Sequence, residues 1–164
     1  MVHKKMSLQK QPSASTCFAT AFAMCLGADV KEVIEYMPDP EQQIWPTEEV
    51  HNFRGHHPQE LVDFAYDNDV SVICIDAMPA FAHHSSTLQG QMRHYLTEEQ
   101  YTKRFEKYLY GNYGVLAGVA GFNAGHAVAW DGEKVYDPRG EIYQDITIQV
   151  MSFYIFKPNL VFKG

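Results

Sequence analysis

The chain contains three cysteines, and Cys17 is the one whose position favours a nucleophilic thiol. Cys17 begins the segment 17–26, in which apolar residues recur with helical spacing. Unpaired N–H groups and the helix dipole favour negative charge at a helix N-terminus. Such a position can lower a cysteine pKa from ~8.5 to between ~3.5 and ~7.5. Because the thiolate is the reactive form, we predict that Cys17 is a nucleophile.

The alternative for Cys17 is that of most free cysteines, which act as small buried hydrophobic residues. Cys25 lies near the other end of the same predicted helix, on its apolar side. Cys74 lies within 70–75, a short run rich in β-branched residues that predicts a buried strand. We therefore expect Cys25 and Cys74 to be core residues.

A histidine and an aspartate are placed to support such a thiol. Asp131-Gly132 separates two β-like runs, 125–130 and 133–137, which predicts a hairpin with a two-residue turn. In that register His126 faces Asp137, with Cβ atoms roughly 4.5–5.5 Å apart. The carboxylate would accept a hydrogen bond from the imidazole and orient it, as in a catalytic triad. A longer turn would shift the register and is expected to break this geometry, and the alternative is a surface His–Asp pair.

A glutamine amide completes the candidate site. Gln11 precedes Cys17 by six residues. Its side-chain amide and the Cys17 backbone N–H are suitable donors to an oxyanion. The order glutamine, cysteine, histidine, aspartate is that expected for acyl transfer by a thiolate.

The elements that position these residues divide the chain into two halves. The first half is mainly helical and the second mainly strand, which predicts an α+β fold with helices on one side of an antiparallel sheet. We expect a single domain, 1–164. Ser15 or Thr16 should cap the first helix and Gly27 should end it. The expected helices are 17–26, one from Asp29 to Met37, one beginning at Pro58 and 97–109; the expected strands are 70–75, 114–120, 125–130, 133–137 and 150–157.

Composition excludes several classes of protein. Thirteen Lys and Arg against twenty Asp and Glu give a net charge of −7, which disfavours binding to nucleic acid or to anionic membranes. An odd number of cysteines argues against a disulfide framework. No apolar run reaches the ~18 residues of a membrane helix, and no signal peptide is evident. The expected location is therefore the cytoplasm, or a host cell into which the protein is delivered.

No metal or other cofactor is expected. The eight histidines include the pairs His56-His57 and His83-His84, but none has the close spacing of a zinc site. The glycines between 111 and 125 lack the Gly-Lys-Ser/Thr sequence of a phosphate-binding loop.

These segments resemble the papain-like cysteine peptidases, and more closely their short bacterial and phage relatives, including the C39-like and AvrRpt2-like groups. The resemblance rests on Gln11, on Cys17-Phe18-Ala19, on the histidine segment 125–128 and on the Asp-Pro of 136–138. It covers roughly 8–29 and 112–140. Phe18 replaces the usual Trp or Gly, Asp137 replaces the Asn of papain, and only 109 positions separate Cys17 from His126.

The resemblance implies a role for each site residue. Cys17 would be the nucleophile, His126 the base, Asp137 the residue that orients the base and Gln11 an oxyanion donor. Apart from the resemblance, Trp45, Phe18 and Gly125 are expected to contact substrate; the alternative for Trp45 is an ordinary long surface loop. No propeptide is expected, because only sixteen residues precede Cys17.

The expected activity is hydrolysis of a peptide or isopeptide bond in a protein or peptide. One alternative is deamidation or transamidation of glutamine at the same site. Another is a catalytically idle papain-like domain that acts by binding, for example to block a host factor. A third is a domain without this chemistry, whose motif matches arise by chance.

Overall fold

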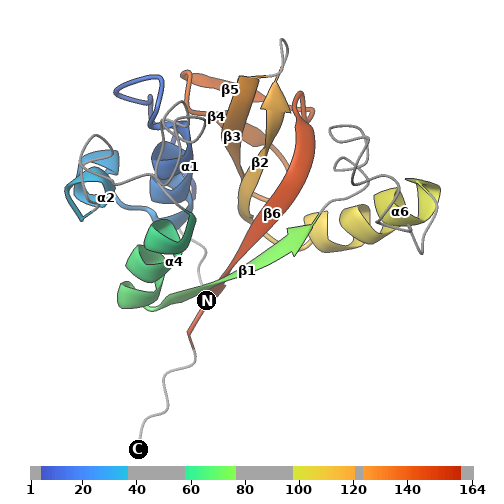
Figure 1. Ribbon diagram of the computed structural model, residues 1–164, viewed down its shortest axis with the longest axis horizontal. Coiled ribbons are helices and arrows are strands. Elements are labelled where there is room, and N and C mark those ends of the chain that lie inside the picture. Colours follow the sequence, from blue (N-terminus) through green and yellow to red (C-terminus); the bar gives the residue numbers. More distant parts are fainter. Residues whose placement is uncertain (1–4, 37–57, 77–97, 121–123, 160–164) are drawn as a thin grey trace, which may run out of the picture.

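The computed structural model describes residues 5–36, 58–76, 98–120 and 124–159 (Figure 1). These residues form helices packed against an antiparallel sheet, as the sequence predicts. The helices are α1 (Cys17–Leu26), α2 (Val30–Tyr36), α4 (Pro58–Asp67) and α6 (Glu98–Leu109). The strands are β1 (Val70–Asp76), β2 (Gly114–Ala120), β3 (Ala124–Trp130), β4 (Val135–Asp137), β5 (Glu141–Tyr143) and β6 (Gln149–Pro158).

Helix α1 spans the segment predicted from its apolar spacing. Gly27 ends it in the left-handed conformation, with φ 69°. The Gly27 and Ala28 N–H groups donate to the Met24 and Ala23 carbonyls, 3.4 and 3.0 Å away, in the pattern of a Schellman motif. Thr16 stands at the N-cap, but its side chain makes no capping hydrogen bond to the helix. The predicted end of the helix is confirmed, whereas the predicted side-chain cap is wrong.

Helix α1 is the centre of the core. Phe22 is fully buried, as are the small residues on either side of it, and its ring centroid lies 5.0 Å from that of Phe156 on β6. The helix contacts β2 and β3 on one side and α2 and α4 on the other. A helix buried around most of its circumference holds its first residue in a fixed place against the sheet.

The sheet has the strand order β1-β6-β2-β3-β4-β5, and every neighbouring pair is antiparallel. Alternation along β3 divides its side chains between two clusters: Ala127 and Ala129 belong to the cluster around α1, while Val128 and Trp130 belong to a second cluster. The small side chains of Ala127 and Ala129 allow α1 to approach β3 closely.

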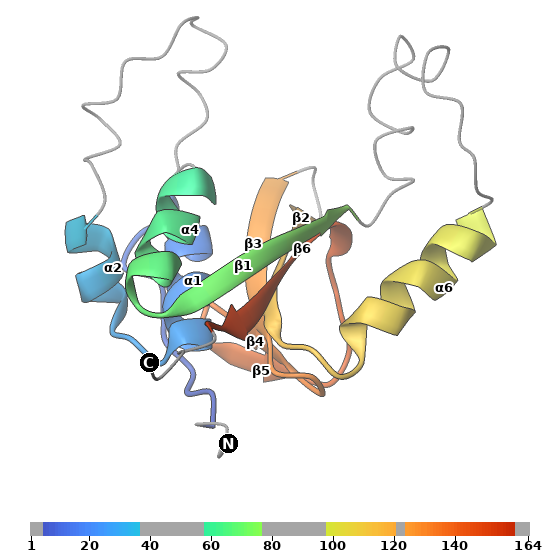
Figure 2. The ribbon, with the colours of Figure 1, turned by 90° about the horizontal axis from the view of Figure 1, so that it is seen from below.

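Helix α6 lies apart from the other helices (Figure 2). Figure 2 shows α1, α2 and α4 at one side of the sheet and α6 at the other. Phe105 of α6 packs edge-on against Phe153 of β6, 6.1 Å between centroids, and the Trp130 indole donates to the Leu109 carbonyl, 3.0 Å. The prediction that all helices lie on one side of the sheet is therefore wrong for α6.

Strand β1 lies at the edge of the sheet that the described residues form, and β6 is its one partner among them. Ile73 is 48% exposed and Cys74 is exposed. The prediction of a buried strand with Cys74 in the core is therefore wrong. A β-branched run favours extended backbone whether or not both of its faces are covered, so its composition does not establish burial.

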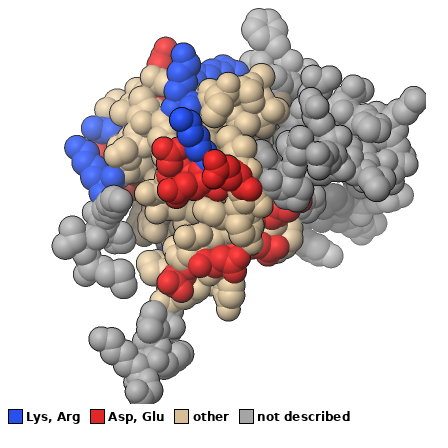
Figure 3. Space-filling view, turned by 90° about the vertical axis from the view of Figure 1, so that its left-hand side faces the viewer, with Lys and Arg blue, Asp and Glu red and all other residues tan. Residues whose placement is uncertain are grey.

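The surface carries mixed charge on the face shown in Figure 3, the side where α2 lies in Figure 1. Asp and Glu side chains gather there in two groups, and Lys and Arg side chains lie beside the upper group. Among the described residues, no helix is long and apolar enough to cross a membrane.

Candidate active site

Cys17 is the first residue of α1, and its thiol is half-buried against β3. The backbone N–H groups of Ala127, Phe18 and Cys17 hydrogen-bond the sulfur and lower its pKa. Burial outweighs them and raises the pKa of Cys17 above its ordinary value, and the charge of Asp137 adds to the rise. The expectation of a lowered pKa, drawn from the helix terminus alone, is wrong. The free-energy cost of removing the thiolate from water exceeds the stabilisation that these N–H groups give it.

The raised pKa predicts slow alkylation of Cys17 at neutral pH. A thiol whose pKa is raised is protonated below that pKa, so its reactive fraction grows as the pH rises past the range of an ordinary thiol. Iodoacetamide labelling followed by peptide mass spectrometry should show Cys17 reacting more slowly than the exposed Cys74 at pH 7. The ratio of the two labelling rates should approach one above pH 9. Fast labelling of Cys17 at pH 6 that is lost in His126→Ala would instead indicate a thiolate–imidazolium pair.

His126 and Asp137 form a buried hydrogen-bonded pair. His126 Nε2 lies 2.9 Å from Asp137 Oδ1, and the two side chains are only 4% and 6% exposed. A carboxylate can only accept, so Nε2 carries the proton and Nδ1 of a neutral ring keeps its lone pair. The Arg139 N–H donates to the same Asp137 oxygen at 2.9 Å, which fixes the carboxylate from its other side.

The hairpin that carries this pair has a longer turn than predicted. Trp130 pairs with Val135, so residues 131–134 form the turn, and Asp131 Oδ1 accepts the Glu133 and Lys134 N–H groups at 2.8 and 2.7 Å. The predicted register, with Asp137 opposite His126, is wrong by two residues.

The two-residue shift leaves the contact intact because side chains alternate with a period of two. His126 and Asp137 still share a face of the sheet. In the observed register they are diagonal neighbours, and long side chains can reach across that distance.

Gln11 is held beside the turn that follows Asp137. Its backbone N–H donates to the Pro138 carbonyl at 2.7 Å, and its side-chain Nε2 donates to the Ser13 carbonyl at 2.9 Å. Its Oε1 is buried and has no partner among the described residues. Three segments therefore meet at the site: the loop before α1, the start of α1 and the β3–β4 hairpin.

The structure brings four of the predicted residues into this region. Cys17 contacts the backbone of Ala127, the residue after His126, and Gln11 is bonded to the residue after Asp137. Among the described residues, no hydrogen bond joins the Cys17 thiol to the His126 ring.

The predicted substrate contacts have different surroundings. Phe18 is half-buried, and its ring lies 5.2 Å from those of Phe22 and Tyr154, so it packs into the core beside the site. Gly125 is exposed, and a Cβ placed on it would meet no atom of the described residues within 4 Å. Trp45 lies outside the described residues. Contact of these three residues with substrate stays a prediction.

Sequence reasoning missed the turn Asp137–Gly140. Gly140 adopts φ 103°, and its N–H donates to the Asp137 carbonyl at 2.8 Å. The sequence Asp-Pro-Arg-Gly carries the signal of such a turn, with Pro at its second position and Gly at its fourth. The turn supplies both the Arg139 donor to Asp137 and the Pro138 acceptor for Gln11.

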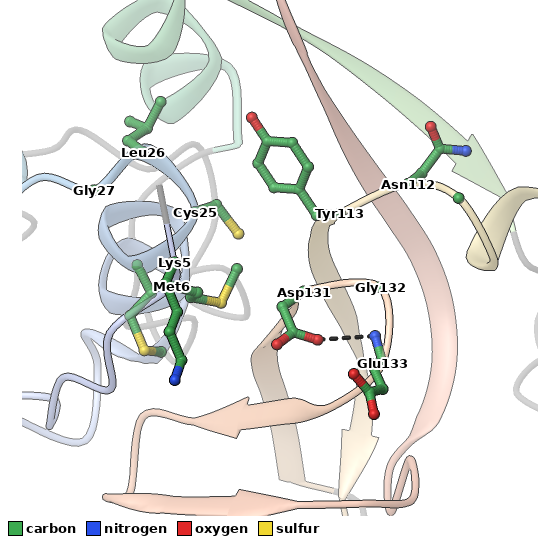
Figure 4. A pocket seen from close by; sticks show the side chains of 12 residues that line it. Lys5, Met6, Cys25, Leu26, Gly27, Asn112, Tyr113, Asp131, Gly132 and Glu133 are labelled. Atoms are coloured by element: carbon green, nitrogen blue, oxygen red, sulfur yellow. Dashed lines mark hydrogen bonds between the residues drawn. The ribbon is translucent and has the colours of Figure 1, made fainter. Parts of the chain in front are cut away.

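A cavity of about 580 Å³ lies at the other end of α1 (Figure 4). Cys25 lines it together with Lys5, Met24, Tyr113 and Glu133, and none of the candidate catalytic residues takes part. Burial raises the pKa of Cys25, so this thiol is also protonated. Cys25 stands eight residues after Cys17, about 12 Å along the helix, and belongs to a different environment.

The described residues hold no group of three or more His, Cys, Asp or Glu side chains arranged to bind a metal ion.

No protein-family model matches the sequence, and no curated protein is similar to it in sequence. The fold is similar to that of a solved structure, the crystal structure of a double-glycine motif protease from an AMS/PCAT transporter in complex with the leader peptide. The TM-score is 0.53, the sequence identity is 15%, and the match covers 94% of this chain and 93% of that chain. The chain has a papain-like α+β fold, similar to that of this protease.

Proposed function

We propose that the protein is a thiol-dependent hydrolase in which Cys17 attacks a peptide or isopeptide bond. The buried hydrogen bond between His126 and Asp137, next to the residue that contacts the Cys17 thiol, carries the proposal. The alternative of an incidental surface His–Asp pair does not account for the burial of both side chains. It also does not account for the additional hydrogen bond from the Arg139 N–H to Asp137. The similarity of the fold to a protease supports the same reading.

The first step in the proposed mechanism is a proton transfer. Asp137 holds the Nε2 proton of His126, so Nδ1 is the nitrogen that accepts the Cys17 proton. Since burial raises the Cys17 pKa, the nucleophile rests as a thiol. The proton moves as the sulfur attacks, and Asp137 stabilises the imidazolium that forms.

The remaining steps complete hydrolysis. The carbonyl oxygen becomes an oxyanion, which accepts hydrogen bonds from the Cys17 N–H and from Gln11 Nε2. His126 then gives its proton to the leaving amine, and the acyl group remains on sulfur as a thioester. Water, deprotonated by His126, attacks the thioester, and the acid leaves as the thiol recovers its proton.

A peptide is the proposed substrate because the similar protease was solved with a leader peptide bound. Gly125 precedes His126, is exposed and presents no side chain, so an extended peptide could pass close to the imidazole there. Phe18 and Trp45 are also proposed substrate contacts. The Phe18 ring packs into the core beside the site, so it would support the substrate-binding surface from the core side.

The proposal is tested with a synthetic peptide library that includes leader-type sequences with a double-glycine motif. New peptide termini, detected by mass spectrometry, are expected with the wild-type chain and absent with Cys17→Ala. Ammonia release from glutamine peptides without new termini would replace hydrolysis by deamidation. Neither product, over the whole library, would favour a binding protein.

A further inference from the structure

Thr16, directly before Cys17, is buried and bonded to the loop that leads into α1. Its hydroxyl accepts the Ser13 N–H at 3.1 Å and donates to the Ser13 carbonyl at 2.9 Å. The Thr16 N–H also points to that carbonyl, at 3.3 Å. One side chain therefore fixes both backbone groups of Ser13.

The Ser13 carbonyl is the same group that receives the Gln11 side chain. Gln11 Nε2 donates to it at 2.9 Å. A primary amide has two N–H groups; Ser13 accepts from one, and the second has no acceptor among the described residues. Because the Gln11 backbone is already anchored to Pro138, the direction of this second N–H depends mainly on where the Ser13 carbonyl lies.

We propose that Thr16 is a positioning residue, whose hydroxyl aims the Gln11 amide at the oxyanion through the Ser13 carbonyl. The inference rests on the proposed hydrolase function and extends it to Thr16. The Thr16 hydroxyl bonds to Ser13 and not to the thiol or the imidazole. The hydroxyl fixes the carbonyl, the carbonyl fixes one amide N–H, and the other N–H then points to the reacting carbonyl oxygen.

Thr20 offers a matched control in the same helix. It is fully buried, and its hydroxyl donates to the Thr16 carbonyl at 2.7 Å, within the first turn. That bond involves the Thr16 backbone, not its hydroxyl, and reaches neither Ser13 nor Gln11. Thr20→Val thus removes a buried hydroxyl of the same kind without altering the Ser13 link.

The test compares Thr16→Val, Thr16→Ser and Thr20→Val on the peptide that the wild-type chain cleaves fastest in the library. Gln11→Ala should lower kcat by on the order of 10²-fold, the effect of losing one oxyanion donor. Thr16→Val should lower kcat by about 10-fold with KM nearly unchanged, because the donor is misdirected and not removed. Thr16→Ser should restore most of the rate, and Thr20→Val should stay within twofold of wild type.

Two further readouts separate positioning from stability. In the Gln11→Ala background, Thr16→Val should change kcat by less than twofold, since the group it positions is gone. The NMR signals of the Gln11 side-chain amide should shift in Thr16→Val and not in Thr20→Val. Unchanged amide signals in Thr16→Val, or equal kcat losses in both valine variants, would overturn the proposal. If Cys17→Ala retained full cleavage, the hydrolase proposal itself would fail, whatever the amide signals show.

Discussion

Asp137→Ala is expected to lower kcat by on the order of 10⁴-fold, the size of loss that follows from replacing the orienting aspartate of a triad. Asp137 Oδ1 is the partner that holds the proton on His126 Nε2. Without it, the ring is free to rotate and to carry its proton on Nδ1, where it cannot accept the thiol proton. The measurement is kcat on a peptide from the library, with circular dichroism as the control for folding.

Asp137→Asn should lower kcat less than Asp137→Ala does. Asp137 Oδ1 accepts both the His126 ring and the Arg139 N–H, so an amide oxygen in that place satisfies the same two donors. Only the charge is lost, and a charge-assisted hydrogen bond is roughly twice as strong as a neutral one. Equal losses in the two variants would show that charge, and not orientation of the ring, is the contribution of Asp137.

Gly118→Ala is expected to destabilise the fold by about 3 kcal/mol or more, because the new methyl group has no room. A Cβ at Gly118 would lie 1.9 Å from the Gln149 carbonyl oxygen on β6. That atom belongs to backbone in a paired strand, so the strands themselves must separate. Gly118 pairs with His126 in the sheet, beside an irregularity in the β2–β6 register, so the strain would fall on the strand position opposite His126.

Gly125→Ala is the matched control, since its Cβ would meet no atom within 4 Å in the part of the chain that the structure describes. For a chain of this size, 3 kcal/mol corresponds to a fall in Tm of about 6–12 °C. Gly118→Ala should show at least that fall, and Gly125→Ala a change of less than about 2 °C. A Gly118→Ala protein with the wild-type Tm would contradict the close approach of β2 and β6.

The sequence was sufficient to predict the candidate residues and much of the fold. Helix 17–26 was predicted with its bounds because apolar spacing and Gly27 act locally. The contact between His126 and Asp137 was predicted from a wrong register, and it holds because a shift of two residues preserves the face of each side chain. Asp131 accepts two backbone N–H groups with its side chain and so stabilises a four-residue turn. This conformation competes with the two-residue Asp-Gly turn.

Features that depend on several distant segments could not be predicted. Burial of Cys17 comes from the packing of α1 against β3, so the direction of its pKa shift was not evident from the helix terminus alone. The exposure of Cys74 is not evident from the sequence, because strand composition does not show whether a strand lies at an edge. The Thr16–Ser13–Gln11 chain of hydrogen bonds required the loop conformation itself.

The central claim is that Cys17, and not another thiol, performs the chemistry. The most direct measurement compares cleavage of the same library peptide by Cys17→Ala, Cys25→Ala and Cys74→Ala. Cys25 lines the distant cavity and Cys74 lies on the edge strand, so their variants should retain cleavage within about fivefold of wild type. Cys17→Ala should fall by at least about 10³-fold. Cleavage that survives in Cys17→Ala, or is lost only in Cys25→Ala or Cys74→Ala, would contradict the account.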